Sequence, residues 1–226
     1  DMGFQPSIDS IVARMNQQRQ TLLFSATYPD KIHRIAQRVM TDPLQVEADT
    51  RHDDSSIQQF FYEVTRDDQR MTGLRLLLLQ QRPESTLVFC NTKREADAIA
   101  EELQENGFSA LALHGDIEQK YRREILVQFT NNSIGVLVAT DVAARGLDIN
   151  NIDAIVNYQI ARDPEVHVHR IGRTGRAGSS GKAYSFYSEQ DDDLIKRIED
   201  SWGKPIKPAT LPPVGLLKKT PPRSTM

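Results

Sequence analysis

Short apolar runs recur along the chain at intervals of roughly 20–30 residues. Most of them are rich in β-branched or aromatic residues, and polar residues or glycine end each one. Runs of this kind are typical of buried strands. Strands are therefore predicted at residues 22–24, 60–64, 87–90, 110–113, 136–139, 154–158 and 183–187.

Helical patterns lie between these runs. Apolar residues within 96–103 recur with the spacing of one helical face. Thr92 and Glu95 before that face have the spacing of a capping box. Gly107 after it is placed to end the helix. The segment from Thr92 to Gly107 is therefore predicted to be a helix with its two ends.

Two further apolar faces have helical spacing. One covers residues 121–129, with Asp116 as a candidate cap, and the other covers residues 195–202 and begins near Ser188. Strands that alternate with helices in this way are joined by right-handed crossovers and form a mostly parallel sheet. The predicted fold class is α/β, with helices on both faces of the sheet.

Polar clusters follow five of the predicted strands. They are Ser25–Thr27, Asn91–Thr92, His114–Asp116, Thr140–Asp141 and, after a short helix, the glycine- and arginine-rich run 169–178. In an open parallel sheet, ligands bind beyond the carboxyl ends of the strands. The clusters therefore predict a binding site at one edge of the sheet.

Charge and composition limit the kinds of function that the chain can have. The 226 residues carry a net charge of −3, whereas residues 202–226 contain five Lys or Arg and no acid. Binding to nucleic acid would therefore use a local basic patch. The lone cysteine, Cys90, lies in an apolar run, which favours a packed strand position over a nucleophile and a reducing compartment such as the cytoplasm. No apolar run is long enough to predict a membrane span.

Four segments are predicted along the chain. Residues 1–49 contain too few apolar positions for a core of their own, and 50–57 form a linker because 50–56 lack large apolar side chains. Residues 58–203 form the main domain, and 204–226 form a tail rich in proline and lysine. The chain opens with Asp1-Met2 rather than an initiator methionine, so we expect it to begin inside a longer protein.

The run from His169 to Gly178 contains two arginines, Arg173 and Arg176, among glycines. Glycine lets the backbone approach a ligand closely, and arginine offers a planar charge that matches phosphate oxygens. Such a pair suits phosphoryl transfer, in which charge develops on the transferring group. The alternative is a surface turn that is basic without binding a phosphate.

Taken in order, these motifs resemble the DEAD-box ATP-dependent RNA helicases of superfamily 2. The resemblance covers residues 1 to about 203. It depends on Asp1–Phe4, Ser25–Thr27, Leu87–Thr92, His114–Asp116 with Gln119 and Arg122, Val138–Asp148, and His169–Gly178. Within the family, residues 163–170 and the proline-rich tail resemble a bacterial DbpA-like subgroup that acts on ribosomal RNA, which implies a part in ribosome biogenesis.

The resemblance implies a RecA-like fold for residues 58–203, as the second of two such domains. Residues 1–49 would be the last part of the first domain. The 226 residues contain neither a Gly-x-x-x-x-Gly-Lys-Ser/Thr phosphate loop nor an Asp-Glu-Ala-Asp motif. The resemblance therefore implies that ATP and Mg²⁺ are held largely by an N-terminal RecA-like domain outside this chain.

The resemblance also implies roles on the nucleotide side. Arg173 and Arg176 would be arginine fingers that reach the γ-phosphate of ATP. Gly146 would let the backbone approach the phosphates, and Asp148 would accept a hydrogen bond from a ribose hydroxyl. The alternatives are a structural arginine pair that binds carboxylates and a turn cap at Asp148.

A second set of positions resembles those that contact single-stranded RNA through phosphate and sugar. It comprises Asn91, Thr92, Gln119, Arg122, Thr140 and Asp141. Helix capping is an alternative for Thr92 and Gln119. The resemblance assigns coupling between the nucleotide and RNA sites to Ser25, Thr27 and His169. No metal site is predicted, because His167 and His169 are only two residues apart and no cysteine is near them.

These observations predict the C-terminal part of an ATP-dependent RNA helicase that unwinds short duplexes locally. The predicted partners are RNA and the N-terminal RecA-like domain, with no membrane. Two alternatives stay open: a non-catalytic RNA-binding module, and a DNA helicase or remodeller of the same superfamily. Leu22–Phe24 would normally pair inside a sheet, so here we expect that segment to dock on the main domain, to associate with another chain or to stay mobile.

Overall fold

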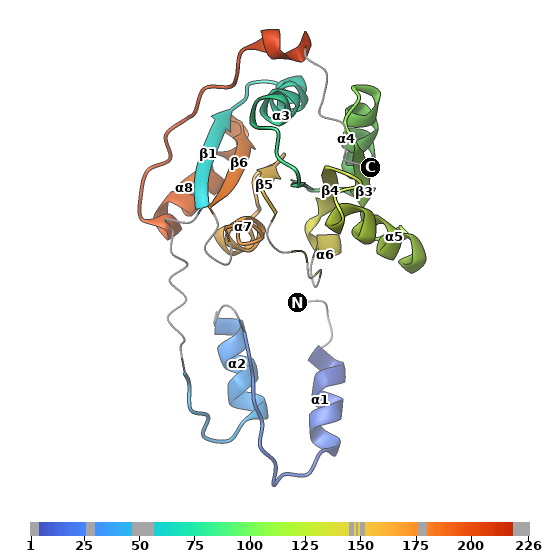
Figure 1. The fold of residues 1–226 in the computed structure, drawn as a ribbon. Coiled ribbons are helices and arrows are strands. Elements are labelled where there is room, and N and C mark those ends of the chain that lie inside the picture. The colour runs from blue at the N-terminus through green and yellow to red at the C-terminus, as the bar shows by residue number, and fades with distance from the viewer. Residues whose placement is uncertain are drawn as a thin grey trace. The chain divides into compact units, whose positions relative to one another are not determined.

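The described part of the chain falls into two units. A computed structural model describes residues 5–25, 30–46, 57–144, 147, 149, 152–175 and 180–218. The units are Asp1–Thr50 and Arg51–Met226, and the second contains the sheet (Figure 1). No helix in the described ranges has the length and apolar composition needed to cross a bilayer.

The sheet of the second unit is entirely parallel. Its strands are β1 (Ile57–Glu63), β2 (Thr86–Cys90), β3 (Ala110–Leu113), β4 (Val136–Thr140), β5 (Ala154–Asn157) and β6 (Gly181–Tyr187). Their order across the sheet is β1-β6-β5-β2-β4-β3 (Figure 1). Each of these strands overlaps one of the apolar runs predicted above, and the α/β fold class is confirmed.

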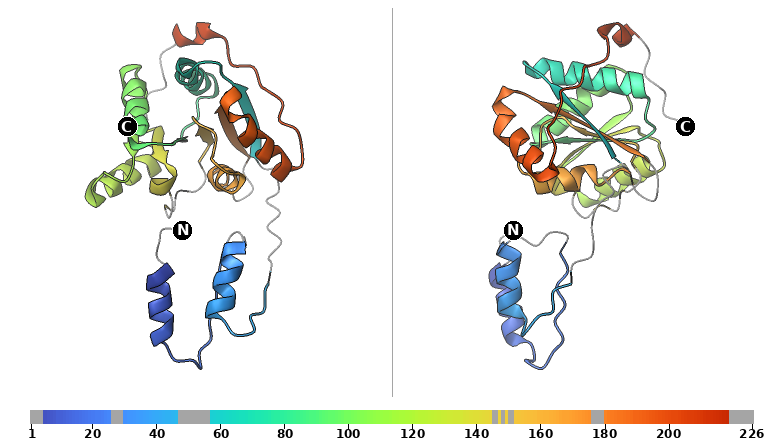
Figure 2. Two further views of the ribbon diagram at one scale, coloured as in Figure 1. Left: turned by 180° about the vertical axis from the view of Figure 1, so that it is seen from behind. Right: turned by 90° about the vertical axis from the view of Figure 1, so that its left-hand side faces the viewer.

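Helices cover both faces of the sheet (Figure 2). Successive residues of β2 point to opposite faces, as the period of a strand requires. Val88 and Cys90 pack in one apolar cluster, and Leu87 and Phe89 pack in another. The first face is covered by α3 (Asp67–Gln81) and α4 (Lys93–Glu105), and the second by α5 (Gln119–Thr130), α6 (Asp141–Ala144), α7 (Pro164–Ile171) and α8 (Asp192–Trp202).

Helix α4 has the predicted ends. The Thr92 side chain accepts from the Glu95 N–H, and the Glu95 carboxylate accepts from the Thr92 N–H, which completes the capping box. The predicted apolar face is buried, and Gly107 after the helix has a φ of 83°, a conformation that favours glycine. The capping interpretation of Thr92 is therefore confirmed.

A short 3₁₀ helix that continues into an α-helix follows β6. Ser188 and Asp191 form a capping box around a short 3₁₀ helix, η1 (Glu189–Asp191), which leads into α8. The beginning predicted near Ser188 is confirmed. Ile198 on the inner face of α8 is buried against Phe61.

The residues after α8 run along the sheet. Pro208 forms a parallel bridge with Phe61 in the edge strand β1, and the Ala209 N–H donates to the Phe61 carbonyl at 2.7 Å. Leu211 and Leu217 pack against the apolar cluster under α3, the second of them from a 3₁₀ helix, η2 (Val214–Lys218). The segment predicted to be a tail is thus packed against the domain as far as Lys218.

The described part of the first unit contains two helices, α1 (Gln5–Arg14) and α2 (Asp30–Val39), which are joined by an ion pair between Asp9 and Arg38. The predicted strand at residues 22–24 is wrong. Leu22 is 66% exposed, Phe24 is 89% exposed and neither pairs with another segment in a sheet. A strand needs neighbours with which to exchange backbone hydrogen bonds, and the described part of this unit has none.

Candidate functional site

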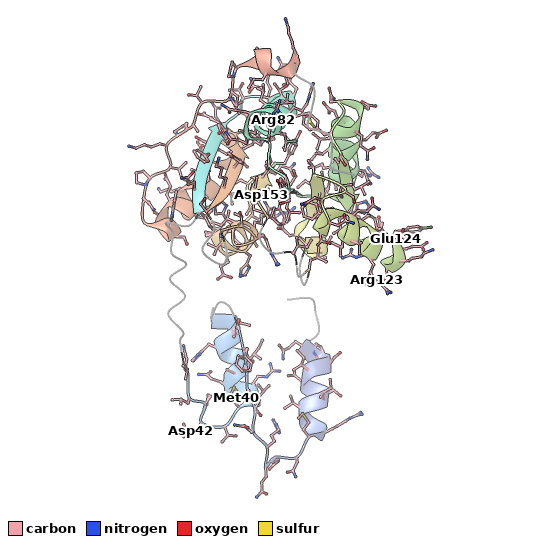
Figure 3. All side chains as sticks on the ribbon, viewed as in Figure 1. Met40, Asp42, Arg82, Arg123, Glu124 and Asp153 are labelled. Carbon is pink, nitrogen blue, oxygen red and sulfur yellow. The ribbon has the colours of Figure 1, made fainter. Side chains whose placement is uncertain are left out.

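The register of the sheet brings the predicted binding segments to one edge. Cys90 is aligned with Thr140 across β2 and β4, and Phe89 with Asn157 across β2 and β5. Asn91 and Asp141 therefore both come directly after aligned strand ends. At the opposite edge, the Asp153 carboxylate accepts from the N–H groups that precede β2 and so links the beginnings of β2 and β5 (Figure 3).

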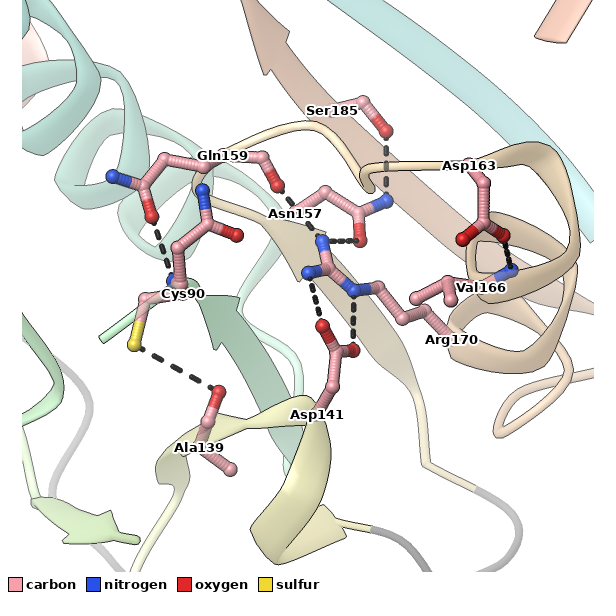
Figure 4. Close-up of polar contacts among 10 residues, drawn as sticks. Cys90, Ala139, Asp141, Asn157, Gln159, Asp163, Val166, Arg170 and Ser185 are labelled. Atoms are coloured by element: carbon pink, nitrogen blue, oxygen red, sulfur yellow. Dashed lines mark hydrogen bonds and ion pairs between the residues drawn. The ribbon is translucent and has the colours of Figure 1, made fainter. Parts of the chain in front are cut away.

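A buried arginine joins these segments (Figure 4). Arg170 of α7 is 1% exposed and binds both oxygens of the Asp141 carboxylate, at 2.7 and 2.8 Å. Its Nη1 donates to the Asn157 side-chain oxygen at 3.2 Å and to the Gln159 carbonyl at 2.8 Å. Its guanidinium also lies over the Phe89 ring, 5.1 Å from the centroid. Each nitrogen of the guanidinium thus has an acceptor, and its charge is compensated.

Arg170 was missing from the predicted site residues. It lies inside the glycine- and arginine-rich run, but the sequence draws attention to the two arginines that glycines flank. The available signal was its position on the short helix that Pro164 begins, three residues before Arg173. That spacing places one arginine on the buried face of α7 and the next one past the end of the helix.

A cavity of about 290 Å³ lies beside Arg170. Its lining comprises Phe89, Asp141, Ala144, Val166, His169, Arg170 and Arg173. The Arg173 guanidinium donates to the Leu147 carbonyl at 2.9 Å. The structure therefore brings three of the predicted residues, Asp141, His169 and Arg173, around one space.

The two histidines of α7 face in different directions, as their spacing predicts. His169 is exposed, whereas His167 is buried against Phe61 and its Nε2 lies 2.9 Å from the side-chain oxygen of Gln59. Burial, and then the nearby Arg170, lower the pKa of His167 to about 4. His167 is therefore neutral at pH 7. Among the described residues, no group of three His, Cys, Asp or Glu side chains could hold a metal ion.

Arg122 connects the turn after β3 to α6 at the same edge. It donates to the His114 carbonyl after β3 at 3.1 Å and to the Ala143 carbonyl of α6 at 3.2 Å. Gln119 is exposed and is the first residue of α5, whose N-cap position is Glu118. The capping interpretation of Gln119 is therefore wrong, and its side chain has no such structural role.

Two other expectations for α5 need correction. Asp116 does not cap the helix but forms an ion pair with Lys93 at 2.5 Å, because the helix begins two residues later than predicted, with Glu118 at the N-cap position. In the predicted apolar face, Phe129 is buried but Tyr121 is 52% exposed, since the first turn of α5 extends beyond the sheet. The apolar face of α5 therefore covers only its second half.

Two of the remaining predicted residues lie in described segments and four do not. Thr140 is buried at the end of β4, and Ser25 belongs to the first unit. Thr27, Gly146, Asp148 and Arg176 lie outside the described residues. Cys90 is buried in β2, and this burial raises the pKa of its thiol to about 12, which confirms a packing position over a nucleophile.

The turn after α7 is held closely against β6. The Thr174 hydroxyl donates to the Ile152 carbonyl, and Gly175 has a φ of 67°. A Cβ added at Gly181 would lie against the Thr174 side chain and 2.5 Å from the Gly175 nitrogen. There is therefore no room for a larger residue at the beginning of β6.

Replacing Gly181 with alanine is expected to lower the free energy of unfolding by about 1–3 kcal/mol, because the backbone of the turn has to shift. Urea unfolding followed by circular dichroism measures this. Gly115→Ala is the matched control, since an added Cβ there meets no atom within 4 Å. Equal stability of the two variants would contradict the packing described here.

A second, larger depression includes Gln159 in its lining. It has a volume of about 750 Å³, and its lining includes Arg70, Asn91, Gln159, Arg162 and Asp191. Arg70 and Asp191 form an ion pair at 3.6 Å. Asn91 and Gln159, which come after β2 and β5, thus both line this depression at the carboxyl edge of the sheet.

Comparisons with known proteins agree with this geometry. The family model of the helicase conserved C-terminal domain matches residues 69–178. ATP-dependent RNA helicase DbpA of Escherichia coli is 50% identical over 200 residues, which are 88% of this chain and 44% of DbpA. This chain therefore spans less than half the length of that relative, and the identity supports the DbpA-like subgroup.

Two solved structures show the same fold. E. coli DEAD-box protein SrmB, bound to regulator of ribonuclease activity A, is 32% identical with a TM-score of 0.66, over 74% of this chain and 97% of that chain. A variant of S. cerevisiae Dbp5 bound to RNA and ADP BeF3 is 26% identical with a TM-score of 0.76, over 92% of this chain and 56% of that chain. The chain belongs to the DEAD-box protein family, and its parallel sheet is the RecA-like C-terminal domain of that family.

Proposed function

We propose that the chain is the C-terminal part of an ATP-dependent RNA helicase. In this proposal, residues 58–203 form the second RecA-like domain, and residues 1–49 complete a first domain that binds ATP. The observation that carries the proposal is the shared cavity of Asp141, His169 and Arg173 at the carboxyl edge of the sheet. Residues that bind RNA and residues that act on the nucleotide can both lie at that edge.

RNA binding is assigned to Asn91, Thr92, Gln119, Arg122, Thr140 and Asp141. These side chains offer hydroxyl, amide and guanidinium groups, which bind phosphate and sugar without reading bases. The pairing of Asp141 with Arg170 supports this assignment, because the compensated carboxylate repels a phosphate less than a free one does. Ribosomal RNA is the proposed natural substrate, by similarity to the DbpA-like subgroup.

The nucleotide side is assigned to Arg173 and Arg176 as arginine fingers, with Gly146 and Asp148 near the ribose and phosphates. Arg173 fits this task because it lies past the end of α7 and on the wall of a cavity, where its guanidinium donates to the Leu147 carbonyl at 2.9 Å. Neutralising charge on the transferring phosphoryl group is the chemistry that it would supply. Mg²⁺ and the phosphate loop belong to the N-terminal domain in this proposal.

Ser25, Thr27 and His169 are the proposed coupling residues between the two sites. The exposure of His169 on the cavity wall supports its part. Binding of RNA and ATP across two domains, followed by their closure, would bend one strand and disrupt a short duplex. The proposed location of the protein is the cytoplasm.

A non-catalytic RNA-binding module is the second candidate for the 226 residues alone. The absence of a phosphate-loop motif from this sequence favours it. The purified chain is then expected to bind RNA and to show no ATP hydrolysis above background. RNA-stimulated hydrolysis by the chain alone would contradict this candidate.

Binding of single-stranded RNA by the chain is expected to weaken as salt rises, by about 0.7 log units per tenfold change for each phosphate contacted. Gln119→Ala is expected to lower the affinity by about 3- to 10-fold, because it removes one hydrogen-bonding group. Fluorescence anisotropy with a labelled oligonucleotide measures both. A salt-independent affinity would contradict the proposed grip.

Gln128→Ala is the matched control for Gln119→Ala, since Gln128 is exposed at the other end of α5. Its affinity is expected to equal that of the unmodified chain. Competition with a DNA strand of the same sequence tests the remaining alternative. DNA that competes as well as RNA would favour a DNA helicase or remodeller, because recognition of the 2′-hydroxyl marks an RNA site.

A further inference from the structure

Gln159 follows β5 and lies at the junction of three proposed functional segments (Figure 4). Its side-chain oxygen accepts from the Asn91 N–H at 2.8 Å. Its side-chain nitrogen donates to Oε1 of Glu95. Its own carbonyl accepts from Arg170 at 2.8 Å. One residue thus contacts the turn after β2, the first turn of α4 and the buried arginine of α7.

The orientation of the Gln159 amide follows from its partners. The backbone N–H of Asn91 can only donate, so the amide oxygen must face it and the amide nitrogen must face Glu95. Glu95 then uses its two oxygens separately. Oε1 accepts from Gln159, and Oε2 accepts from the Thr92 N–H at 2.9 Å and from the Thr92 hydroxyl at 2.8 Å.

Two consecutive N–H groups of the β2–α4 turn are therefore held by side chains. The Asn91 N–H is held by Gln159, and the Thr92 N–H is held by Glu95. Because Gln159 and Glu95 also bind each other, neither can leave without weakening the other contact. The pair therefore holds the backbone from which the Asn91 and Thr92 side chains extend.

The same residue reaches the cavity side of the site. Arg170 binds the Gln159 carbonyl and the Asp141 carboxylate at once, and α7 ends three residues before Thr174, with Arg173 between them. A displacement of α7 would therefore be transmitted through Arg170 and Gln159 to the turn at Asn91. No motif of the sequence singled out Gln159 or gave Glu95 a role beyond capping.

We propose that Gln159, paired with Glu95, is a positioning residue that fixes the Asn91–Thr92 turn for RNA and links it to α7. The inference rests on the RNA-binding function proposed above. It assigns Gln159 no direct contact with RNA. Its effect is to hold the backbone of the turn, so that the turn does not have to be ordered when RNA binds.

Gln159→Glu tests the inference with almost no change of shape. The new carboxylate still accepts from the Asn91 N–H, but it cannot donate to Glu95 and places two like charges against each other. The affinity of the 226-residue chain for a labelled single-stranded RNA is expected to fall about tenfold. Hydrogen exchange of the Asn91 and Thr92 amides, measured by NMR, is expected to become faster.

The double variant Gln159→Glu with Glu95→Gln is the rescue. The glutamine at position 95 can donate to the glutamate at position 159 and keep its oxygen for the Thr92 N–H, so the pair forms again with its roles exchanged. The RNA affinity is expected to return to within about threefold of the unmodified chain. Gln128→Glu on the exposed face of α5 makes the same charge change and is the matched control.

The outcomes separate this inference from the proposed function. Lower RNA affinity with Gln159→Glu and recovery of that affinity in the double variant support the inference. Unchanged affinity with Gln159→Glu, while Gln119→Ala still weakens binding, overturns the positioning role and leaves RNA binding standing. An Asn91 amide that exchanges in the unmodified chain as fast as in an unfolded peptide overturns it without any variant. Failure of the unmodified chain to bind RNA overturns both.

Discussion

Replacing Arg173 with alanine is expected to lower the rate of ATP turnover by about 10³-fold or more in the protein that joins this chain to its ATP-binding domain. The charge that develops on the transferring phosphoryl group would lose the guanidinium on the wall of the 290 Å³ cavity. Arg173→Lys is expected to recover little activity, because an ammonium lacks the planar fork that matches phosphate oxygens. Steady-state phosphate release at saturating RNA measures the effect.

The matched control is Arg197→Ala on the exposed face of α8, which is expected to leave turnover unchanged. RNA affinity of the Arg173 variants is also expected to stay within about threefold, since Arg173 is assigned to the nucleotide rather than to RNA. Full turnover after removal of both Arg173 and Arg176 would exclude the arginine-finger assignment.

Replacing Arg170 with alanine is expected to lower the free energy of unfolding of the chain by about 3–5 kcal/mol. The arginine is fully buried and bound by a carboxylate, a side-chain amide and a carbonyl, so its removal leaves Asp141 without its counter-charge and two acceptors without donors. Urea unfolding followed by tryptophan fluorescence, with Trp202 as the probe, measures the loss.

An exposed ion pair provides the comparison. Arg66 binds Asp68 at 2.7 Å, with both side chains largely in solvent. Arg66→Ala is therefore expected to change the unfolding free energy by no more than about 1 kcal/mol. If the Arg66 and Arg170 variants lost similar stability, the buried network would not be the structural centre of the site.

The elements that were predicted well have signals that are local in sequence. The runs at β2 and β4 are short, apolar and ended by polar residues, and the capping box at Thr92 lies within four residues. In each case the physical cause of the structure is contained in one segment. The position of the candidate site at the carboxyl edge could also be predicted, because polar residues come directly after strands that a parallel sheet aligns.

Helix α3 was not predicted, because its apolar residues have no helical period. Leu74 and all four residues of 76–79 are buried, because the sheet covers one side of the helix and other apolar groups cover much of its remaining surface. A helix that is apolar on most sides cannot be distinguished from a strand by periodicity. The exposed segment 22–24 shows the converse: its composition is that of a strand, but pairing depends on partners elsewhere in the chain.

The candidate site was predicted in part. Asn91, Asp141 and Arg173 stand in recognisable motifs, whereas Gln159 lies in a loop of ordinary composition and becomes notable only through its contacts. Arg170 was named within a motif, but burial at 1% is a property of the folded chain. Residues that hold other residues in place leave little trace in a single sequence, because their role depends on distances that folding creates.

The segment that follows α8 has a consequence for handling this domain. An edge strand with free N–H and C=O groups is a template for joining other molecules. Pro208 and Ala209 pair with this edge of β1 at Phe61, and Leu211 packs against the neighbouring apolar cluster. A polypeptide that stopped at Gly203 would lack this contact, so we expect it to self-associate more than one that extends to Lys218.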